Sequence, residues 1–245
     1  MELTRVISGL LFPPVCPFCD KAVKIEEEGK LCKKCVGRIR PFSGPACLKC
    51  GKMLSDDEKA YCGNCRKNSF HFRRGYITFL YEDEVRDMIV KFKYRHRKDM
   101  ALYFARESIE KFDRVLKNGA YDAVVPIPIH KKRMIKRGYN QAAEFGKEIA
   151  TFLGIPCLSS LLKRRKQTAA QKELGAAGRL INLMDAFETD ESELDRTLNA
   201  GIKKLLLVDD IFTTGSTLEC AGIKLIECGF DRPDCLCISG TRGTC

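Results

Sequence analysis

The sequence lacks a hydrophobic run long enough to cross a membrane. The apolar stretch near its start, residues 6–15, is interrupted by Gly9, Pro13 and Pro14. A membrane-spanning helix needs about 20 consecutive apolar residues, and a secretory signal needs a basic start and a small-residue cleavage site. This stretch has none of these features. We therefore expect it to pack on the domain that follows, and we expect no membrane insertion.

Two common nucleotide-binding patterns are also missing. No glycine-rich loop is followed by the lysine of a Walker motif, and there is no Gly-x-Gly-x-x-Gly string. Both patterns place backbone N–H groups around phosphates, so a phosphate ligand would need a different loop in this chain. The sequence also has no low-complexity tract, and its only internal repetition is a pattern of cysteines.

The chain has 245 residues, 44% of them hydrophobic, and a formal net charge of +11 at pH 7. This length suits one small domain and one medium-sized domain with a buried core. The excess of lysine and arginine lies mainly in residues 71–140, whereas residues 181–245 are acidic. A basic surface favours an anionic partner, which could be nucleic acid, a phosphorylated metabolite or a membrane surface.

Eight of the fourteen cysteines form four Cys-x-x-Cys pairs before residue 66. Two such pairs, joined by a short hairpin, offer four thiolates to one zinc ion, and the metal site replaces the core that so short a segment cannot build. We therefore predict two structural zinc ions, each held by neighbouring pairs. The predicted ligands are Cys16, Cys19, Cys32 and Cys35 in the first ribbon and Cys47, Cys50, Cys62 and Cys65 in the second.

The spacing of the cysteine pairs leaves three alternatives open. A cross-braced arrangement would combine the pairs differently, a disulfide framework would need no metal, and iron or an iron–sulfur cluster could use the same thiolates. Because nothing marks the chain for export, we expect a reducing compartment, the cytoplasm. His71 follows closely, but eight cysteines already complete two sites, so we interpret it as a boundary residue.

Strand and helix patterns alternate after the cysteine pairs. The polar residues 66–69 predict a linker, which divides the chain into a double zinc ribbon at 1–68 and a second domain at 69–245. Apolar strands that alternate with helices predict an α/β fold, a parallel sheet flanked by helices. The expected strands are residues 75–81, 122–128, 158–162, 204–211 and 234–239, and the expected helices are residues 85–92, 100–116, 141–153 and 216–228.

Residues 205–218 carry the most informative pattern. An apolar strand ends in Asp209 and Asp210, and a turn of small hydroxyl residues around Gly215 then leads into a helix. Open α/β sheets bind ligands at the carboxyl ends of their strands. The turn offers backbone N–H groups, hydroxyls and a helix N-terminus to a phosphate. The two carboxylates would repel a phosphate, so we expect them to face hydroxyl groups such as those of a ribose.

This string resembles the signature of the type I phosphoribosyltransferases. The resemblance implies that Asp209 and Asp210 are catalytic-site acids that hold the ribose hydroxyls of phosphoribosyl pyrophosphate. It further implies magnesium, bound together with the pyrophosphate. The residues implied for the 5′-phosphate are Thr213, Thr214, Gly215, Ser216 and Thr217.

Two more stretches, residues 125–141 and 162–187, together with the cysteine pairs, resemble the ComF/GntX family, which is linked with DNA uptake in competent bacteria. The resemblance implies a pyrophosphate side formed by Arg133, Arg137, Gly138, Asn140 and Gln141. It also implies a hood over the site, residues 163–182, that contains Arg165, Thr168, Gln171, Arg179 and Asn182. Gly178 and Asp185 depart from the family pattern, where an acid and a glycine are usual, and leave the geometry of the hood open.

The resemblance implies transfer of the phosphoribosyl group to an acceptor nitrogen, with release of pyrophosphate. A non-catalytic sensor of phosphoribosyl pyrophosphate and a single-stranded DNA-handling factor that works with other DNA-uptake proteins are the alternatives. Residues 91–98 interleave cations with aromatic rings, as single-strand binders do, although Phe92 also continues an apolar helix face. His130 has no acid nearby in the sequence, so we interpret it as a surface residue rather than a general base.

Overall fold

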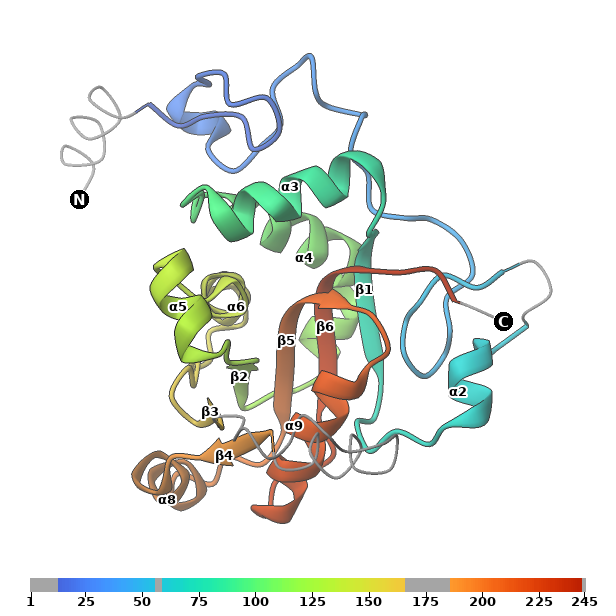
Figure 1. Ribbon diagram of the computed structural model, residues 1–245, viewed down its shortest axis with the longest axis vertical. Helices are drawn as coiled ribbons and strands as arrows, with labels where there is room; N and C mark the ends of the chain where they lie inside the picture. Colours follow the sequence, from blue (N-terminus) through green and yellow to red (C-terminus); the bar gives the residue numbers. More distant parts are fainter. Residues whose placement is uncertain (1–12, 56–58, 166–185, 244–245) are drawn as a thin grey trace.

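The structure is a computed structural model that describes residues 13–55, 59–165 and 186–243. Four parallel strands form its central sheet (Figure 1), as the sequence predicted. Their order across the sheet is β1 (Gly75–Leu80), β6 (Asp234–Gly240), β5 (Leu205–Phe212) and β2 (Ala123–Pro126). Because all four run in the same direction, their carboxyl ends meet at one edge of the sheet.

Each face of the sheet is covered by its own layer. The helices on one face are α3 (Asp83–Tyr94), α4 (Met100–Asn118) and α6 (Gln141–Leu153), and α9 (Ser216–Glu227) lies on the other. On β5, Leu206 and Val208 belong to the core with the three helices, whereas Leu205 and Leu207 belong to the core with α9. Burial on both faces explains why this strand is continuously apolar.

The remaining elements are short and lie around this sandwich. They are the 3-10 turn η1 (Ile25–Glu27) and α2 (Gly63–Lys67) in the ribbons, α5 (Lys131–Arg137), the antiparallel pair β3 (Leu162–Arg164) and β4 (Phe187–Thr189), and α8 (Glu191–Asn199). Among the described residues, no helix combines the length and the apolar composition that a membrane span requires.

Two local predictions were wrong. The strand expected at residues 158–162 begins only at Leu162, and residues 158–161 turn instead, with Leu161 N donating to Leu158 O. The linker expected at residues 66–69 begins with Arg66 and Lys67 in the last turn of α2. The second error arose because polar residues in a short exposed helix look like a loop in the sequence.

The two ribbons pack on different parts of the sandwich (Figure 1). Ile39, next to the first ribbon, joins the core that contains α3 and α4. In the second ribbon, Cys47, Cys50 and Cys62 lie in the same core as Phe212 and α9. The second ribbon thus covers the sheet face beside α9. The division into domains at 1–68 and 69–245 remains a prediction, and residues 1–12, with most of the expected apolar strap, lie outside the described part.

Candidate zinc centres and phosphate site

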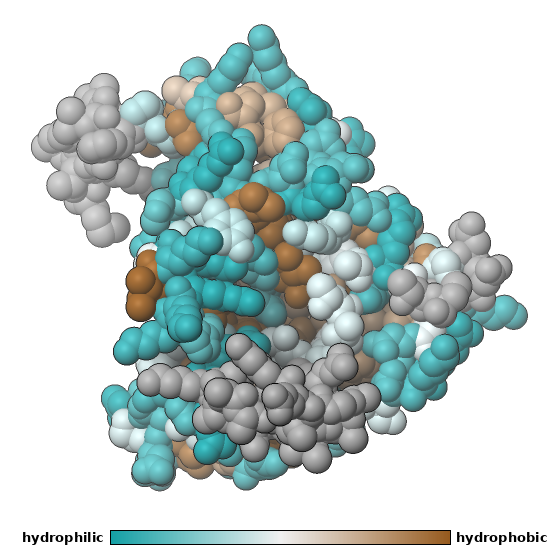
Figure 2. All heavy atoms as spheres, viewed as in Figure 1, coloured by the Kyte–Doolittle hydropathy of each residue, from teal (hydrophilic) through white to brown (hydrophobic). Residues whose placement is uncertain are grey.

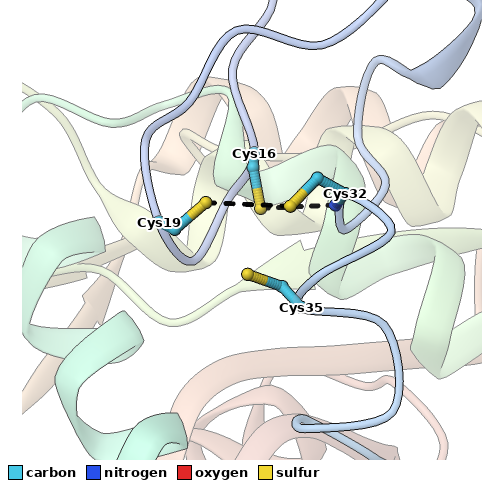
Figure 3. A group of neighbouring side chains, drawn as sticks. All are labelled: Cys16, Cys19, Cys32 and Cys35. Carbon is cyan, nitrogen blue, oxygen red and sulfur yellow. Dashed lines mark hydrogen bonds between the residues drawn. The ribbon is translucent and has the colours of Figure 1, made fainter.

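The structure groups the eight N-terminal cysteines into two tetrads. Within each tetrad the four Sγ atoms all lie within 4.8 Å of one another. The first group is Cys16, Cys19, Cys32 and Cys35 (Figure 3), and the second is Cys47, Cys50, Cys62 and Cys65. Neighbouring pairs therefore combine as predicted, and the cross-braced arrangement is not what the chain forms.

The same backbone design forms both tetrads. The Cys16 N–H donates to Lys21 O at 2.8 Å, and the Cys47 N–H donates to Lys52 O at 2.7 Å. In each tetrad, the first cysteine of the second pair donates its backbone N–H to a sulfur of the first pair. Cys32 N lies 3.4 Å from Cys16 Sγ, and Cys62 N lies 3.4 Å from Cys47 Sγ. Such N–H donors favour the thiolate form that a metal ion needs.

The sulfur geometry fits zinc. With Zn–S bonds of about 2.3 Å, a tetrahedral site places its sulfurs about 3.8 Å apart. The Cys19 and Cys32 sulfurs are 3.8 Å apart, and the Cys50 and Cys62 sulfurs are 3.6 Å apart. All described cysteines are free thiols, so the structure contains two tetrathiolate sites in place of a disulfide framework. The tetrads therefore fit two structural zinc ions.

The predicted phosphate loop lies between β5 and α9. Gly215 has a left-handed backbone with φ +87° and precedes the first residue of α9, Ser216. The Thr214 and Ser216 hydroxyl oxygens are 2.8 Å apart. Within the described residues, no group accepts a hydrogen bond from the backbone N–H of Thr214, Gly215 or Thr217. These donors, with the N-terminus of α9, can bind an anion.

The two acids of β5 differ in their surroundings. Asp209 Oδ1 accepts a hydrogen bond from the Asp210 N–H at 2.8 Å. Burial and the neighbouring Asp210 carboxylate raise the pKa of Asp209 to about 8, although the Lys93 ammonium opposes this increase. Lys93 Nζ itself lies 3.0 Å from Asp210 Oδ2, and both side chains are only about one-seventh exposed, 15% and 14%. A lysine of α3 is therefore part of the acid cluster.

The residues predicted for the pyrophosphate side lie at the turn between α5 and α6, after β2. Arg133 is exposed on α5, and Gly138, with φ +77°, ends that helix. Arg137 is 6% exposed and donates to Gln141 Oε1 at 2.8 Å and to Tyr94 OH at 3.1 Å. Asn140 caps α6, since its Oδ1 accepts from Ala142 N, and its Nδ2 donates to Ile127 O. Three of the five side chains thus shape the turn itself.

Only one of the predicted hood residues, Arg165, falls within the described residues. Its N–H donates to Ala186 O at 2.9 Å and so extends the pairing of β3 with β4. Its neighbour Arg164 is partly buried near the acids. Burial and the charge of Arg133 lower the pKa of Arg164, and the charge of Asp209 opposes them. The other predicted hood residues, Thr168, Gln171, Arg179 and Asn182, lie outside the described part of the chain.

The structure brings two residues to the site that the sequence did not predict there. Lys93 pairs with Asp210, and Asn64 Nδ2 donates to Thr214 O at 3.0 Å. Arg164, which falls within the predicted hood at residues 163–182, lies near Asp209. The cation-rich run at residues 91–98 indicated Lys93 only as part of a nucleic-acid contact, and nothing in the sequence indicated a role for Asn64. As expected, His71 does not belong to a tetrad. It pairs with Glu219.

Two cysteine tetrads in front of a parallel, helix-flanked sheet define a zinc-ribbon protein with an α/β domain. The sequence model of the double zinc ribbon domain family matches residues 7–66. The chain is 31% identical over 207 residues to Competence protein F of Haemophilus influenzae, which covers 83% of this chain and 87% of that protein. It belongs to the ComF family.

Two more distant relatives are similar along almost their whole length. Competence protein ComFC of Bacillus subtilis is 24% identical over 243 residues, which cover 93% of this chain and 95% of the relative. DNA utilization protein YhgH of Escherichia coli strain K12 is 23% identical over 235 residues, which cover 95% of this chain and 99% of the relative. The similarity thus extends through the ribbons and the α/β domain.

Proposed function

We propose that the chain binds phosphoribosyl pyrophosphate, together with magnesium, at the carboxyl end of β5. The observation that carries this proposal is the adjacency of two kinds of group. Asp209 and Asp210 end the apolar part of the strand, and the loop that follows has N–H groups of Thr214, Gly215 and Thr217 available to a ligand. Carboxylates suit the hydroxyls of a ribose, and the N–H groups suit its 5′-phosphate.

The pyrophosphate requires positive charge on the other side of the site. Arg133 and Arg164 are candidates, since the charge of Arg133 lies close enough to lower the pKa of Arg164. Arg137, Gly138, Asn140 and Gln141 would hold the backbone of the turn in place, as their contacts within the protein indicate. Magnesium, when bound with the pyrophosphate, would neutralise part of its charge.

We further propose that the site transfers the phosphoribosyl group to an acceptor nitrogen and releases pyrophosphate. The contribution of the protein would be electrostatic, because fixed charges stabilise the leaving pyrophosphate while the acids hold the ribose. Because pyrophosphate is a good leaving group, the transfer does not need a strong general base. We propose that this activity serves DNA uptake in the cytoplasm, and the names of two relatives, Competence protein F and DNA utilization protein YhgH, support a link with DNA.

An assay of pyrophosphate release with a panel of nitrogen acceptors tests the transfer. Release that depends on one acceptor class supports an enzyme. Tight binding of phosphoribosyl pyrophosphate with no release for any acceptor would favour the alternative, a non-catalytic sensor. No binding at all would contradict both versions.

Single-strand DNA binding is a second candidate because α5 presents a basic surface. Lys131, Lys132 and Lys136 are exposed, and none of them forms an ion pair within the described ranges. Tyr94 lies beside them with its side chain half exposed, and Lys136 Nζ is 5.7 Å from the centre of its ring. Figure 2 shows hydrophilic residues over much of this side of the molecule, although Met134 and Ile135 of the same helix are also exposed. Binding of an oligonucleotide that weakens steeply with salt, and less steeply after replacement of the three lysines, would support this role.

A further inference from the structure

The second ribbon and the predicted phosphate loop are in direct contact. The helix α2 starts immediately after Cys62 and contains Cys65, so two of the four thiolates fix its position. Between them, Asn64 donates a hydrogen bond of 3.0 Å from Nδ2 to the carbonyl oxygen of Thr214. Asn68, at the end of the helix, donates to Asn64 Oδ1 at 2.8 Å and orients its amide. Figure 1 shows α2 near the connection from β5 to α9.

The acceptor of this hydrogen bond, the Thr214 carbonyl, lies just before α9. In a regular helix, Thr214 O would accept from the N–H four residues later, but α9 begins only at Ser216 and Asn64 supplies the donor instead. The contact directs the Thr214 peptide group and therefore influences the N–H of Gly215, which belongs to the same peptide unit. That N–H is one of the donors that the proposed function assigns to the phosphate.

Apolar packing reinforces the contact. A Cβ atom on Gly215 would lie 3.2 Å from the ring of Phe70 and 2.8 Å from that of Phe212, so both rings lie directly against the loop. The Lys52 ammonium, next to the second tetrad, lies 5.7 Å from the centre of the Phe212 ring. Cys47 and Cys62 share a core with both aromatic residues. The loop is thus built partly on the second ribbon.

The first tetrad has different neighbours and offers a natural control. Asp20 in the first knuckle pairs with Lys91 in the last turn of α3 and with Arg97 just beyond that helix. Arg38, just beyond this tetrad, pairs with Glu84 at the start of the same helix. These hydrogen bonds and ion pairs thus join the first ribbon to α3 and the segment after it, and none of those given for its described residues reaches residues 213–217.

We propose that the second tetrad, acting through Asn64, holds the phosphate loop in its binding conformation, so that metal binding there and phosphate binding at the loop are coupled. This inference rests on the proposed function, which assigns the loop to the 5′-phosphate. A Cys-x-x-Cys site without its metal loses the fold of its knuckles, so α2 would lose its fixed position. The loop would then be less ordered in the free protein, and ordering it would cost part of the free energy of phosphate binding. Asn64 is a positioning residue in this arrangement.

The test compares Cys65→Ser with Cys19→Ser in the full chain. Both cysteines are partly buried, and each belongs to a different tetrad. We expect each variant to lose about one zinc ion. We expect Cys65→Ser to bind phosphoribosyl pyrophosphate about 10-fold or more weakly, within the usual range of coupling between sites, and Cys19→Ser to bind within about 3-fold of wild type. Equal losses in both variants would overturn the proposal.

Asn64→Ala removes the hydrogen bond to the loop but leaves the metal ligands in place. It therefore tests the role of Asn64 even if Cys65→Ser does not fold. This variant keeps all eight cysteines, so two zinc ions should remain. We expect binding to weaken by roughly 3- to 10-fold, the effect of one hydrogen bond, and faster hydrogen exchange at residues 213–217. Unchanged exchange in Asn64→Ala would overturn the inference. If exchange accelerates but wild type shows no binding, Asn64 holds the loop and the proposed ligand is wrong.

Discussion

Lys93 and Asp210 form an ion pair that joins α3 to the acid end of β5, with 3.0 Å between the ammonium nitrogen and a carboxylate oxygen. The neighbouring Asp209 is pushed toward its protonated form by burial and by the charge of Asp210, and Lys93 opposes that shift. Lys93 therefore offsets part of the repulsion between two adjacent carboxyl groups at the edge of the sheet. A ribose hydroxyl binds best to a carboxylate that stays charged.

Lys93→Gln should weaken the binding of phosphoribosyl pyrophosphate. Without the ammonium the two acids repel each other more strongly, and the pKa of Asp209 rises further. Fewer charged carboxylates then remain near neutral pH. We expect a loss of about 1–2 kcal/mol, roughly 10-fold in affinity, that becomes smaller as the pH rises. Titrations between about pH 6.5 and pH 9 measure both effects.

Lys93→Arg is the matched control, because it keeps the charge and should retain most of the affinity. If Lys93→Gln bound as tightly as wild type or more tightly, the lysine would be a competitor of the ligand for Asp210. The role assigned to the ion pair would then be incorrect.

Gly215→Val should abolish detectable phosphate binding. Its backbone at φ +87° disfavours a β-branched residue by about 1–2 kcal/mol, and the new side chain would collide with Phe212 and Phe70. Gly201→Val is the control, since Gly201 has φ +74° and nothing within 4 Å of the added Cβ. Thermal unfolding should show both variants destabilised. Binding that survives in Gly215→Val, or is lost equally in Gly201→Val, would exclude a specific role of this loop.

Asp209→Asn should change how stability depends on pH. The pKa of Asp209 is about 8 in the folded protein against an ordinary value of 3.8, so the folded state binds more protons between these values. Wild type therefore loses stability as the pH rises through this range, and asparagine, which cannot ionise, does not. Relative to wild type, the melting temperature of the variant should rise by about 2 °C or more between about pH 6 and pH 9. A difference that is independent of pH would show that Asp209 titrates normally.

The purified protein should carry two zinc ions per chain. The two tetrads have matching backbone hydrogen bonds and sulfur separations close to those of a tetrathiolate site. Elemental analysis of protein prepared without added metal measures this directly. Iron in place of zinc, or disulfides among the first eight cysteines, would be the contrary result.

The sequence predicted elements that carry a strong local signal. The apolar run before Asp209 predicted a strand that is buried on both faces. The spacing of the cysteine pairs predicted a metal site formed by Cys16, Cys19, Cys32 and Cys35. Both predictions were confirmed. The helix predicted at residues 141–153 was also confirmed, and it ends at Gly154, which has φ +67°. The α5 helix was not predicted because nearly all of its side chains are exposed and it shows no apolar periodicity.

Contacts between distant segments could not be predicted in this way. Asn64 looks like an ordinary spacer inside a Cys-x-x-Cys pair, and only the packing of the second ribbon against β5 brings it to Thr214. Lys93 similarly belongs to a cation-rich run whose members have separate partners, since Lys91 pairs with Asp20 and Lys93 with Asp210. The composition of residues 91–98 had suggested one role, nucleic-acid binding, for the whole run.

Calorimetry with phosphoribosyl pyrophosphate and magnesium tests the central claim most directly. We expect wild type to bind with a measurable heat, and Asp210→Asn, which keeps the shape but removes a charged acceptor, to bind more weakly by roughly 1–3 kcal/mol. The variant should retain two zinc ions, because Asp210 does not contact the tetrads. If wild type gives no heat of binding, or if Asp210→Asn binds as wild type does, the ligand is not held by the acids and loop of β5.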